Sequence, residues 1–205
     1  DANPPGLQHA SVVMCPTRGG KVAQFDGAAA QMMPGVKQVL AVAPYHGGTG
    51  GVAVIADTPW HAKKAAAAVT VQWDHGPAAT LSSAAVMTQL TQALDQAQGF
   101  GYHSVGDVDK ALQGAATTLT ADYRAPYLAH ATMEPINCTV QFKDGAASVW
   151  TSTQVPGLAR MAAAKALGID EDRVTVHQLL LGGGFGRRLE VDYVAQAAAI
   201  AKAAG

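Results

Sequence analysis

The feature that most constrains this chain is a glycine-rich stretch near its C-terminal end, residues 180–190, with the sequence LLGGGFGRRLE. Four glycines fall within five residues, between the β-rich run Val174–Gln178 and an alanine-rich helical run over residues 191–204. Glycine suits positions where the backbone needs a positive φ or lies flush against another group. A glycine-rich turn from strand to helix also presents free backbone N–H groups, which suit oxo groups or phosphate. The stretch therefore predicts either an anion-facing loop or a tight turn whose glycines only let the helix pack closely.

The common nucleotide-binding motifs do not fit this stretch. A Walker A loop needs a Lys-Ser or Lys-Thr pair after its glycines, and two arginines follow them here. A dinucleotide fingerprint of the form G-x-G-x-x-G, counted from Gly182 and Gly184, places Arg187 where the third glycine belongs. The stretch therefore indicates a different anionic cofactor, or none. A nucleotide-binding α/β domain is disfavoured.

Composition excludes several other classes of function. The 205 residues carry 14 basic and 15 acidic side chains, a net charge of −1, so there is no electrostatic footprint for nucleic acid or anionic lipid. We expect no transmembrane segment, since the sequence has no apolar run of about eighteen residues. Cys15 and Cys138 are the only cysteines, which excludes a cysteine-ligated iron–sulfur cluster or a zinc ribbon within this sequence. We expect them to be two buried thiols rather than a disulfide.

The histidines do not predict a metal site. His130 and Glu134 are four residues apart, a spacing at which a helix would bring two metal ligands together, but Pro126 and Pro135 indicate an extended segment. We expect no direct protein ligand to a metal. Two alternatives remain for His130 and Glu134. They either line a substrate or cofactor cavity, or they bridge a loop by hydrogen bonds.

The pattern of elements predicts an α/β (α+β) fold in two regions. Residues 1–78 read as β-α-β-β-α-β, with Asp57-Thr58-Pro59-Trp60 as a helix start. Residues 79–100 form a linker helix, and residues 101–205 form a second α/β region. The elements expected in that region are a helical turn capped by Asp107, strands over 118–124, 137–142 and Ala146–Thr151, helix Pro156–Leu167 and strand Val174–Gln178. Gln154 and the glycine-rich stretch then both follow strand ends, the edge where α/β sheets bind ligands.

Three ordered motifs give the chain a family resemblance. Ser152-Thr153-Gln154 lies about thirty residues before Gly182-Gly183-Gly184-Phe185-Gly186, and residues 127–138 read YLAHATMEPINC. At this spacing, the chain resembles the molybdenum-cofactor-binding subunit of the xanthine dehydrogenase/aldehyde oxidase superfamily. The branch of isoquinoline 1-oxidoreductase β-subunits and membrane-associated bacterial aldehyde dehydrogenases is the most similar. The resemblance implies a small "hammerhead" domain over 1–78, followed by the first part of a molybdopterin-binding domain, in a fragment of a longer subunit.

The resemblance also implies roles for particular residues. Gln154 matches the glutamine that hydrogen-bonds an oxo ligand of molybdenum, a task for an amide that donates without titrating. The implied cofactor-binding residues on the loop are Gly183, Gly184, Phe185, Gly186 and Arg187. Leu189 is implied to lie at the substrate pocket, and Glu134 is a further candidate for that pocket. Leu189 stands where xanthine-oxidising members have a substrate-orienting glutamate, so an aldehyde or aromatic N-heterocycle is the expected substrate rather than a purine.

The chemistry implied is hydroxylation with oxygen derived from water at a molybdenum-pterin cofactor, expected to be molybdopterin cytosine dinucleotide. The implied partners are a small 2Fe-2S subunit and, as a further candidate, a cytochrome c subunit, in the periplasm or at a membrane facing it. The catalytic base of the family is expected beyond Gly205, so we expect no catalytic residue here and an inactive isolated fragment. The competing hypothesis is a non-catalytic scaffold or binding domain that kept the fold without the cofactor.

Overall fold

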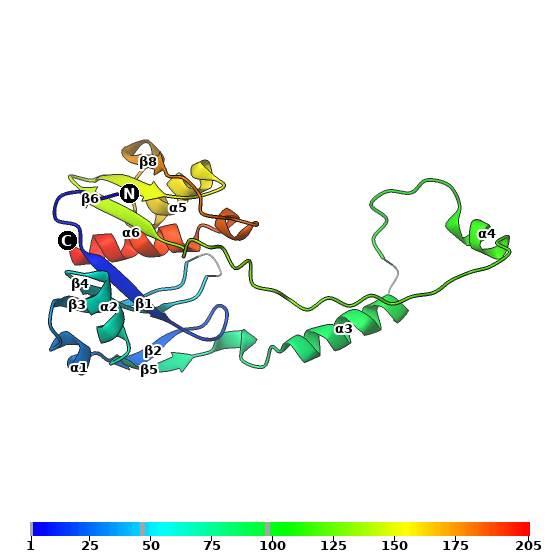
Figure 1. The fold of residues 1–205 in the computed structure, drawn as a ribbon, viewed down its shortest axis with the longest axis horizontal. Coiled ribbons are helices and arrows are strands. Elements are labelled where there is room, and N and C mark those ends of the chain that lie inside the picture. The colour runs from blue at the N-terminus through cyan, green and yellow to red at the C-terminus, as the bar shows by residue number, and fades with distance from the viewer. Residues whose placement is uncertain (1, 46–47, 97–98) are drawn as a thin grey trace. The chain divides into compact units, whose positions relative to one another are not determined.

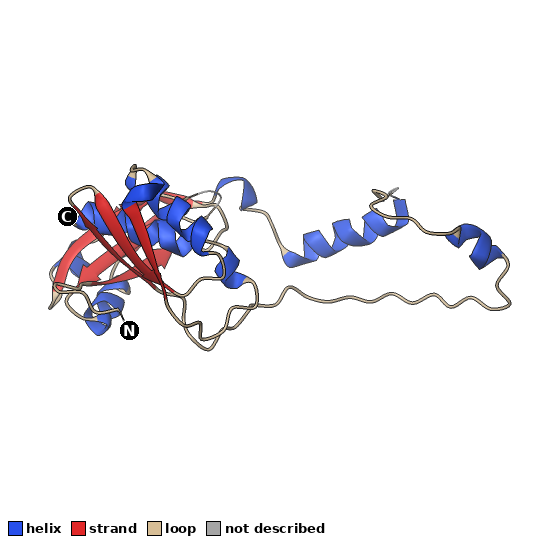
Figure 2. Ribbon diagram, turned by 90° about the horizontal axis from the view of Figure 1, so that it is seen from above, coloured by secondary structure: helices blue, strands red, loops and turns tan. Residues whose placement is uncertain are grey.

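A computed structural model describes residues 2–45, 48–96 and 99–205 of the chain. The chain divides into two compact units. The larger unit combines Asp1–Ala79 with His130–Gly205, and the smaller unit is Thr80–Ala129. Helices and strands are interleaved along the larger unit, which confirms the predicted α/β class (Figure 2).

The strands of the larger unit form three sheets within the described residues. In order of pairing, they are β1 (His9–Met14), β4 (Gly51–Ala56) and β3 (Val36–Val42) in the first sheet; β2 (Lys21–Asp26) and β5 (Thr70–Asp74) in the second; and β6 (Cys138–Lys143), β7 (Ala146–Thr151) and β8 (Val174–Gln178) in the third. The helices and single 3₁₀ turns are α1 (Ala28–Gln31), α2 (Pro59–Ala66), η1 (Gly76–Ala78), α5 (Pro156–Leu167), η2 (Glu171–Arg173), η3 (Arg187–Leu189) and α6 (Asp192–Ala204). Neighbouring strands are antiparallel except β7 and β8, which are parallel.

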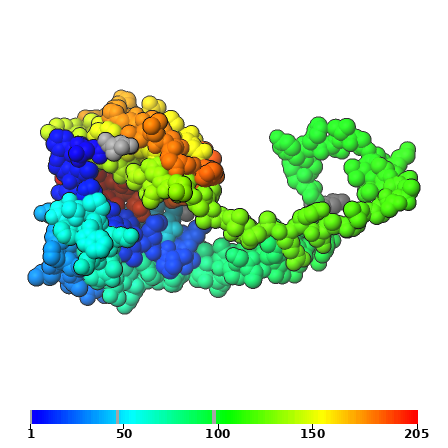
Figure 3. Space-filling view, viewed as in Figure 1, coloured from blue at the N-terminus to red at the C-terminus, as the bar shows by residue number. Residues whose placement is uncertain are grey.

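The first sheet is covered on both faces, which explains why every residue of its central strand β4 is buried. Val54 packs with alanines of α2 on one face. Ala53 and Ile55 point the other way and pack with Ile200 of α6. Helix α6 also contacts β6, so it lies between the first and third sheets (Figure 1). Little of it is visible in the space-filling view (Figure 3).

The third sheet positions the candidate site. A two-residue turn joins β6 to β7, and both of its residues, Asp144 and Gly145, have positive φ, as a type I′ hairpin turn requires. Helix α5 then returns the chain so that β8 pairs parallel to β7. One face of β7 packs Ala147 and Val149 into the core formed with α5 and α6. The parallel pairing brings the carboxyl ends of β7 and β8 to the same edge of the sheet.

The smaller unit contains α3 (Ser83–Gln96) and α4 (Val108–Gln113), whose N-cap Asp107 accepts a hydrogen bond from the backbone N–H of Lys110. The predicted strand over 118–124 is wrong. None of the described residues of this unit is paired into a sheet, and Leu119 and Tyr123 are each 93% exposed. An alternating pattern makes a strand only where a second strand accepts its backbone hydrogen bonds.

Most of the other predicted helices and strands are present in the structure. The bounds of β7, α5 and β8 match the predicted ranges, and the linker helix is α3. Strand β2 was not predicted, so the β-α-β-β-α-β order is wrong and becomes β-β-α-β-β-α-β. Both cysteines are free thiols, as expected, but only Cys15 is buried, whereas Cys138 is partly buried. The domain boundaries at 78 and 100 stay a prediction. No helix of the described residues is long and apolar enough to cross a bilayer.

Candidate functional site

The structure brings two of the sequence motifs together at the carboxyl ends of β7 and β8. Gln154 follows β7 by three residues, and the glycine loop, residues 182–186, follows β8. The side-chain Oε1 of Gln154 accepts a hydrogen bond of 3.1 Å from the backbone N–H of Gly186. The backbone N–H of Gln154 donates to the carbonyl of Arg188 at 3.2 Å. Two chain segments more than thirty residues apart are thus joined directly at this edge.

The absence of a side chain at Gly184 makes this contact possible. A Cβ at that position would lie 2.6 Å from Oε1 of Gln154. Gly183 and Gly186 have φ values of 102° and 95°, and Phe185 between them has φ 52°. A positive φ is uncommon for a residue with a side chain and marks local strain that surrounding contacts must maintain. The loop therefore has a specific backbone conformation that its contacts maintain, and it is more than a tight turn.

The site leaves a group of hydrogen-bond donors available. Among the described residues, none accepts a hydrogen bond from the backbone N–H of Gly183, Gly184 or Phe185. Oε1 of Gln154 accepts the hydrogen bond from Gly186, so the NH₂ group of the same amide points elsewhere with two N–H donors. No described residue accepts a hydrogen bond from this NH₂ group. Three consecutive N–H groups and an adjacent NH₂ group form an array suited to an oxo or phosphate ligand.

A buried arginine, Arg188, underlies the loop, and no sequence motif predicted a role for it. Its side chain is fully buried, at 0% exposure. It forms an ion pair of 2.8 Å with Glu134, which lies in the predicted 127–138 motif. It also hydrogen-bonds Ser152, at the end of β7, and the carbonyl of Gly183. The three motifs of the sequence meet at this one side chain.

Glu134 acts as the hydrogen-bonding bridge that was one of its two predicted alternatives. Its carboxylate accepts from the backbone N–H of Gly182 at 2.9 Å, from Asn137 at 3.1 Å and from Arg188. The Gly182 hydrogen bond is the main cause that lowers the pKa of Glu134 below its usual value, with Asn137, Arg188 and Ser152 adding to the effect. Glu134 is therefore charged at neutral pH, and both oxygens of its carboxylate accept hydrogen bonds. Its predicted contact with a substrate stays a prediction.

The remaining predicted residues lie around the loop. Arg187 forms a two-pronged ion pair with Asp192 at the start of α6, at 3.0 and 2.9 Å, so its charge is already balanced. The side chain of Phe185 is 74% exposed and that of Leu189 is 49% exposed. His130 lies beside the loop, with Nε2 3.8 Å from where a Cβ on Gly186 would be. No three His, Cys, Asp or Glu side chains of the described residues form a group that could hold a metal ion.

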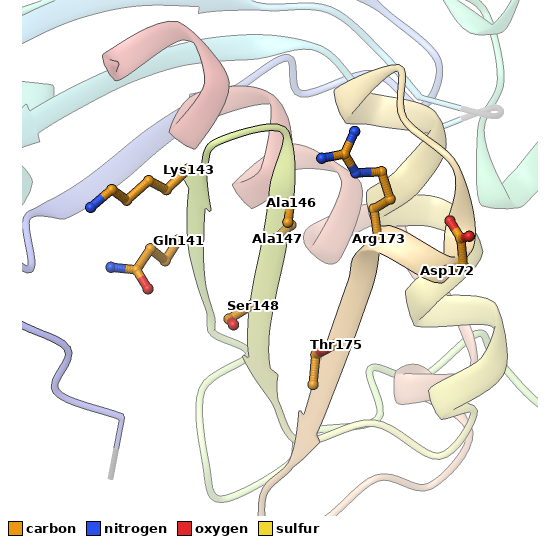
Figure 4. A pocket seen from close by; sticks show the side chains of 8 residues that line it. All are labelled: Gln141, Lys143, Ala146, Ala147, Ser148, Asp172, Arg173 and Thr175. Atoms are coloured by element: carbon orange, nitrogen blue, oxygen red, sulfur yellow. The ribbon is translucent and has the colours of Figure 1, made fainter.

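A separate pocket lies at the opposite end of the third sheet, beside the β6–β7 turn and the start of β8 (Figure 4). It is lined by polar and charged side chains, including Lys143, Asp172 and Arg173, and by the alanines of β7. Arg173 donates to the carbonyl of Asp144 in the hairpin turn. The pocket contains none of the residues predicted to bind a cofactor or substrate, and it is not part of the site at the strand ends.

The fold and the site first define a class: an α/β domain that presents backbone and amide donors, suited to an oxo or phosphate ligand, at the carboxyl edge of a sheet. The model of the molybdopterin cofactor-binding domain family matches residues 90–205, more than half of the chain. The chain belongs to this family. The resemblance inferred from the three motifs is thereby confirmed.

Similar proteins agree with this assignment. The chain is 32% identical to the membrane-bound aldehyde dehydrogenase (pyrroloquinoline-quinone) of Gluconacetobacter polyoxogenes, over 100% of this chain and 27% of that protein. It is 29% identical to the isoquinoline 1-oxidoreductase subunit beta of Brevundimonas diminuta, again over 100% and 27%. The crystal structure of quinoline 2-oxidoreductase from Pseudomonas putida 86 has the same fold, with a TM-score of 0.70 over 100% of this chain and 30% of that one, at 19% identity. The chain spans about a quarter of the length of these curated relatives.

Proposed function

We propose that this chain contributes to the cofactor site of a molybdenum hydroxylase that oxidises an aldehyde or an aromatic N-heterocycle with oxygen derived from water. Membership of the molybdopterin cofactor-binding family supports the cofactor class. The names of the aldehyde dehydrogenase and isoquinoline oxidoreductase relatives support the substrate class. We further propose molybdopterin cytosine dinucleotide as the cofactor form, a 2Fe-2S subunit and a cytochrome c subunit as electron-accepting partners, and the periplasm as the location.

The single observation that carries this proposal is the hydrogen bond from the Gly186 N–H to Oε1 of Gln154. An amide side chain has one acceptor end and one donor end. With the acceptor end fixed against the loop, the donor end of Gln154 remains for a ligand, as do the N–H groups of Gly183, Gly184 and Phe185, from which no described residue accepts. The donor set fits a ligand rich in oxo groups.

Each residue then has a defined task in the proposed site. The amide of Gln154 would donate to an oxo ligand without changing charge, and the backbone of the loop from Gly183 to Gly186 would hold the metal end of the cofactor. Arg187, paired with Asp192, fixes the start of α6 beside the loop. When bound, the cofactor supplies the oxygen transfer and the two-electron redox chemistry. The protein's contribution is to hold donors where negative charge develops.

We propose that the catalytic base is supplied from outside these 205 residues. The carboxylate of Glu134 is already engaged by Gly182, Asn137 and Arg188. Glu190 is exposed, one residue after Leu189. The 205 residues alone are accordingly expected to hold no molybdenum and to show no oxidase activity.

A metal analysis of the purified full-length protein separates this proposal from two alternatives. Stoichiometric molybdenum with a pterin released on denaturation supports it. A quinone in place of molybdenum would match the cofactor named for the Gluconacetobacter polyoxogenes relative and would overturn it. Neither group in a folded protein would favour the scaffold hypothesis.

Substitution of Gln154 tests the assigned site directly. In the full-length protein, Gln154→Ala should raise the activation free energy by about 2–4 kcal/mol, because it removes a preorganised hydrogen-bond donor. Thermal stability should change little, since the side chain of Gln154 is exposed. Gln141→Ala is a matched control, because Gln141 is exposed on β6 beside the separate pocket. Unchanged turnover in the Gln154 variant, at normal molybdenum content, would contradict the assignment.

A further inference from the structure

Arg188 is the point at which three distant segments of the larger unit are joined. Its Nε donates to the carbonyl of Gly183 at 2.7 Å, and its Nη1 donates to the carbonyl of Ser152 at 3.2 Å and to the Ser152 hydroxyl. Its Nη2 donates to the carbonyl of Glu134 at 3.0 Å and to the carboxylate of Glu134 at 2.8 Å. All three nitrogens of the guanidinium are therefore used.

The backbone of Arg188 joins the same segments. Its carbonyl accepts from the backbone N–H of Gln154 at 3.2 Å and from the hydroxyl of Thr153 at 3.1 Å. The residue thus holds both sides of the candidate site at once: the glycine loop through its side chain, and the Ser152–Gln154 turn through both side chain and backbone. The carboxylate of Glu134 completes the same connection, because it accepts from the backbone N–H of Gly182 and from the hydroxyl of Ser152.

Placing a cation in this position is costly. A guanidinium withdrawn fully from water must be paired and hydrogen-bonded to be tolerated, and a well-packed apolar side chain of similar volume often gives equal or greater stability. Stability alone therefore gives little reason for an arginine here. The specific geometry that it imposes on its neighbours is the better explanation.

We propose that Arg188 is a positioning residue that sets the direction of the ligand-facing donors of the loop and of Gln154. This inference rests on the proposed function for the identity of the ligand, but the geometry stands by itself. A trans peptide is planar, and its C=O and N–H point in opposite directions. By holding the carbonyl of Gly183, Arg188 directs the N–H of Gly184 away from itself.

The same reasoning applies at the other side of the site. With the backbone N–H of Gln154 bound to the carbonyl of Arg188, the side chain of Gln154 starts from a fixed backbone position and reaches the N–H of Gly186. Lysine cannot replace this arrangement, because a single ammonium group lacks the planar fork that reaches three segments in fixed directions. The charge would be kept while the positioning would be lost.

Hydrogen exchange tests the positioning role without any use of activity. In the full-length protein, Arg188→Lys should speed exchange at the bonded amides of Gln154, Gly182 and Gly186 by about tenfold or more, whereas exchange within α5 should stay unchanged. Arg173→Lys is the matched control, since the side chain of Arg173 makes a single hydrogen bond to the described residues, at the opposite end of the sheet. Faster exchange throughout the larger unit would mean a merely structural role and would overturn the proposal, as would unchanged exchange at the three amides.

A second variant covers the case in which Arg188→Lys does not fold. Ser152→Ala removes one partner of Nη1 and keeps the ion pair with Glu134. It should speed exchange at the same three amides to a smaller extent. No change there would overturn the proposal.

Kinetics then test whether Arg188 acts through Gln154. We expect Arg188→Lys to lower kcat about tenfold or more with little change in KM. In a protein that already carries Gln154→Ala, the same substitution should lower kcat less than about threefold. The effects of mutations at residues that act as one unit are not additive. Equal losses in both backgrounds would overturn the coupling. If the protein proves to hold no molybdenum, the proposed function fails, but the exchange experiment still decides the positioning role.

Discussion

At the scale of single residues, two adjacent arginines have opposite environments. Arg187 is partly exposed and pairs with Asp192 at the start of α6, whereas Arg188 is fully buried and pairs with Glu134. Both lie in the 3₁₀ turn η3, in which successive side chains point about 120° apart. The turn therefore sends one guanidinium outward to a helix and the next inward beneath the glycine loop. This rotation explains why Arg187 pairs with Asp192 while Arg188 pairs with Glu134.

The close approach of Gly184 to Gln154 gives a prediction at the same scale. Gly184→Ala would place a Cβ 2.6 Å from Oε1 of Gln154 and should displace the amide from Gly186. We expect turnover of the full-length protein to fall on the order of tenfold or more, as for a misplaced hydrogen-bond donor. Gly157→Ala in α5 is the control, because nothing lies within 4 Å of its Cβ position. Equal activity of the two variants would show that the contact is not needed.

Glu134 gives a pH-dependent prediction. Its lowered pKa means that its contribution to stability is complete above the unfolded-state pKa, near 4.3, and is lost as pH falls through the lower folded-state pKa. Glu134→Gln should cost on the order of 2–3 kcal/mol at pH 7, because it leaves the buried Arg188 without its counter-charge. Denaturant unfolding at several pH values should show this difference constant from pH 7 to about pH 5 and shrinking below about pH 4.

The exposed pair of Arg160 and Glu171 provides the comparison for Glu134. Their side chains are 51% and 48% exposed at a separation of 3.5 Å, so Glu171→Gln should cost less than about 1 kcal/mol. A loss as large as that of Glu134→Gln would mean that burial of Arg188 is not the cause. A difference that grows as the solution becomes more acidic would contradict the sign of the pKa shift.

At the scale of elements, a helix or strand could be predicted from the sequence where the contacts that determine it are local. Helix α5 was predicted with its true bounds because a proline begins it and Gly168, at φ 73°, ends it. Strand β2 was missed, since four of its six residues are exposed and its apolar pattern is weak. The strand predicted over 118–124 has the pattern without a partner in the described chain. A pattern limits the options of a segment, and pairing between distant segments decides among them.

The hairpin of β6 and β7 allows an element-scale test. Gly145 has φ 69° in the turn, and a Cβ there would lie 3.1 Å from the guanidinium of Arg173. Gly145→Ala should destabilise the protein by about 1–2 kcal/mol, because a side chain disfavours this left-handed backbone. Denaturant unfolding measures the loss. A variant as stable as the parent would show that the turn readily adopts another form.

At the scale of the whole molecule, the candidate site was predictable in part. The pairing of Gln154 with the glycine loop followed from two strand ends in the sequence, and the structure places them in contact. The Arg188 network was not predictable, because nothing local distinguishes Arg188 from Arg187. It depends on the joint placement of residues 134, 152 and 183, which only the folded chain brings together.

Substrate preference is a property of the complete molecule, and Leu189 gives a way to test it. Leu189 is apolar and 49% exposed at the end of η3, directly after the loop. A leucine there offers no hydrogen bond to the polar edge of a purine, and an unpaired polar group typically costs several kcal/mol in discrimination. We therefore expect the full-length protein to have a higher kcat/KM for benzaldehyde or isoquinoline than for xanthine, measured by steady-state kinetics. The reverse order would remove the basis for the proposed substrate class.

The variant Leu189→Glu should shift the ratio of kcat/KM values toward xanthine, since it supplies a carboxylate where the leucine stands. Leu158→Glu is the matched control, because Leu158 is also exposed, at 47%, but lies on α5 and makes no part of the site. A shift with Leu189→Glu alone assigns specificity to this position. If neither variant shifts the ratio, Glu190 or a residue outside this chain faces the substrate, and the apolar character of Leu189 has no bearing on what the enzyme oxidises.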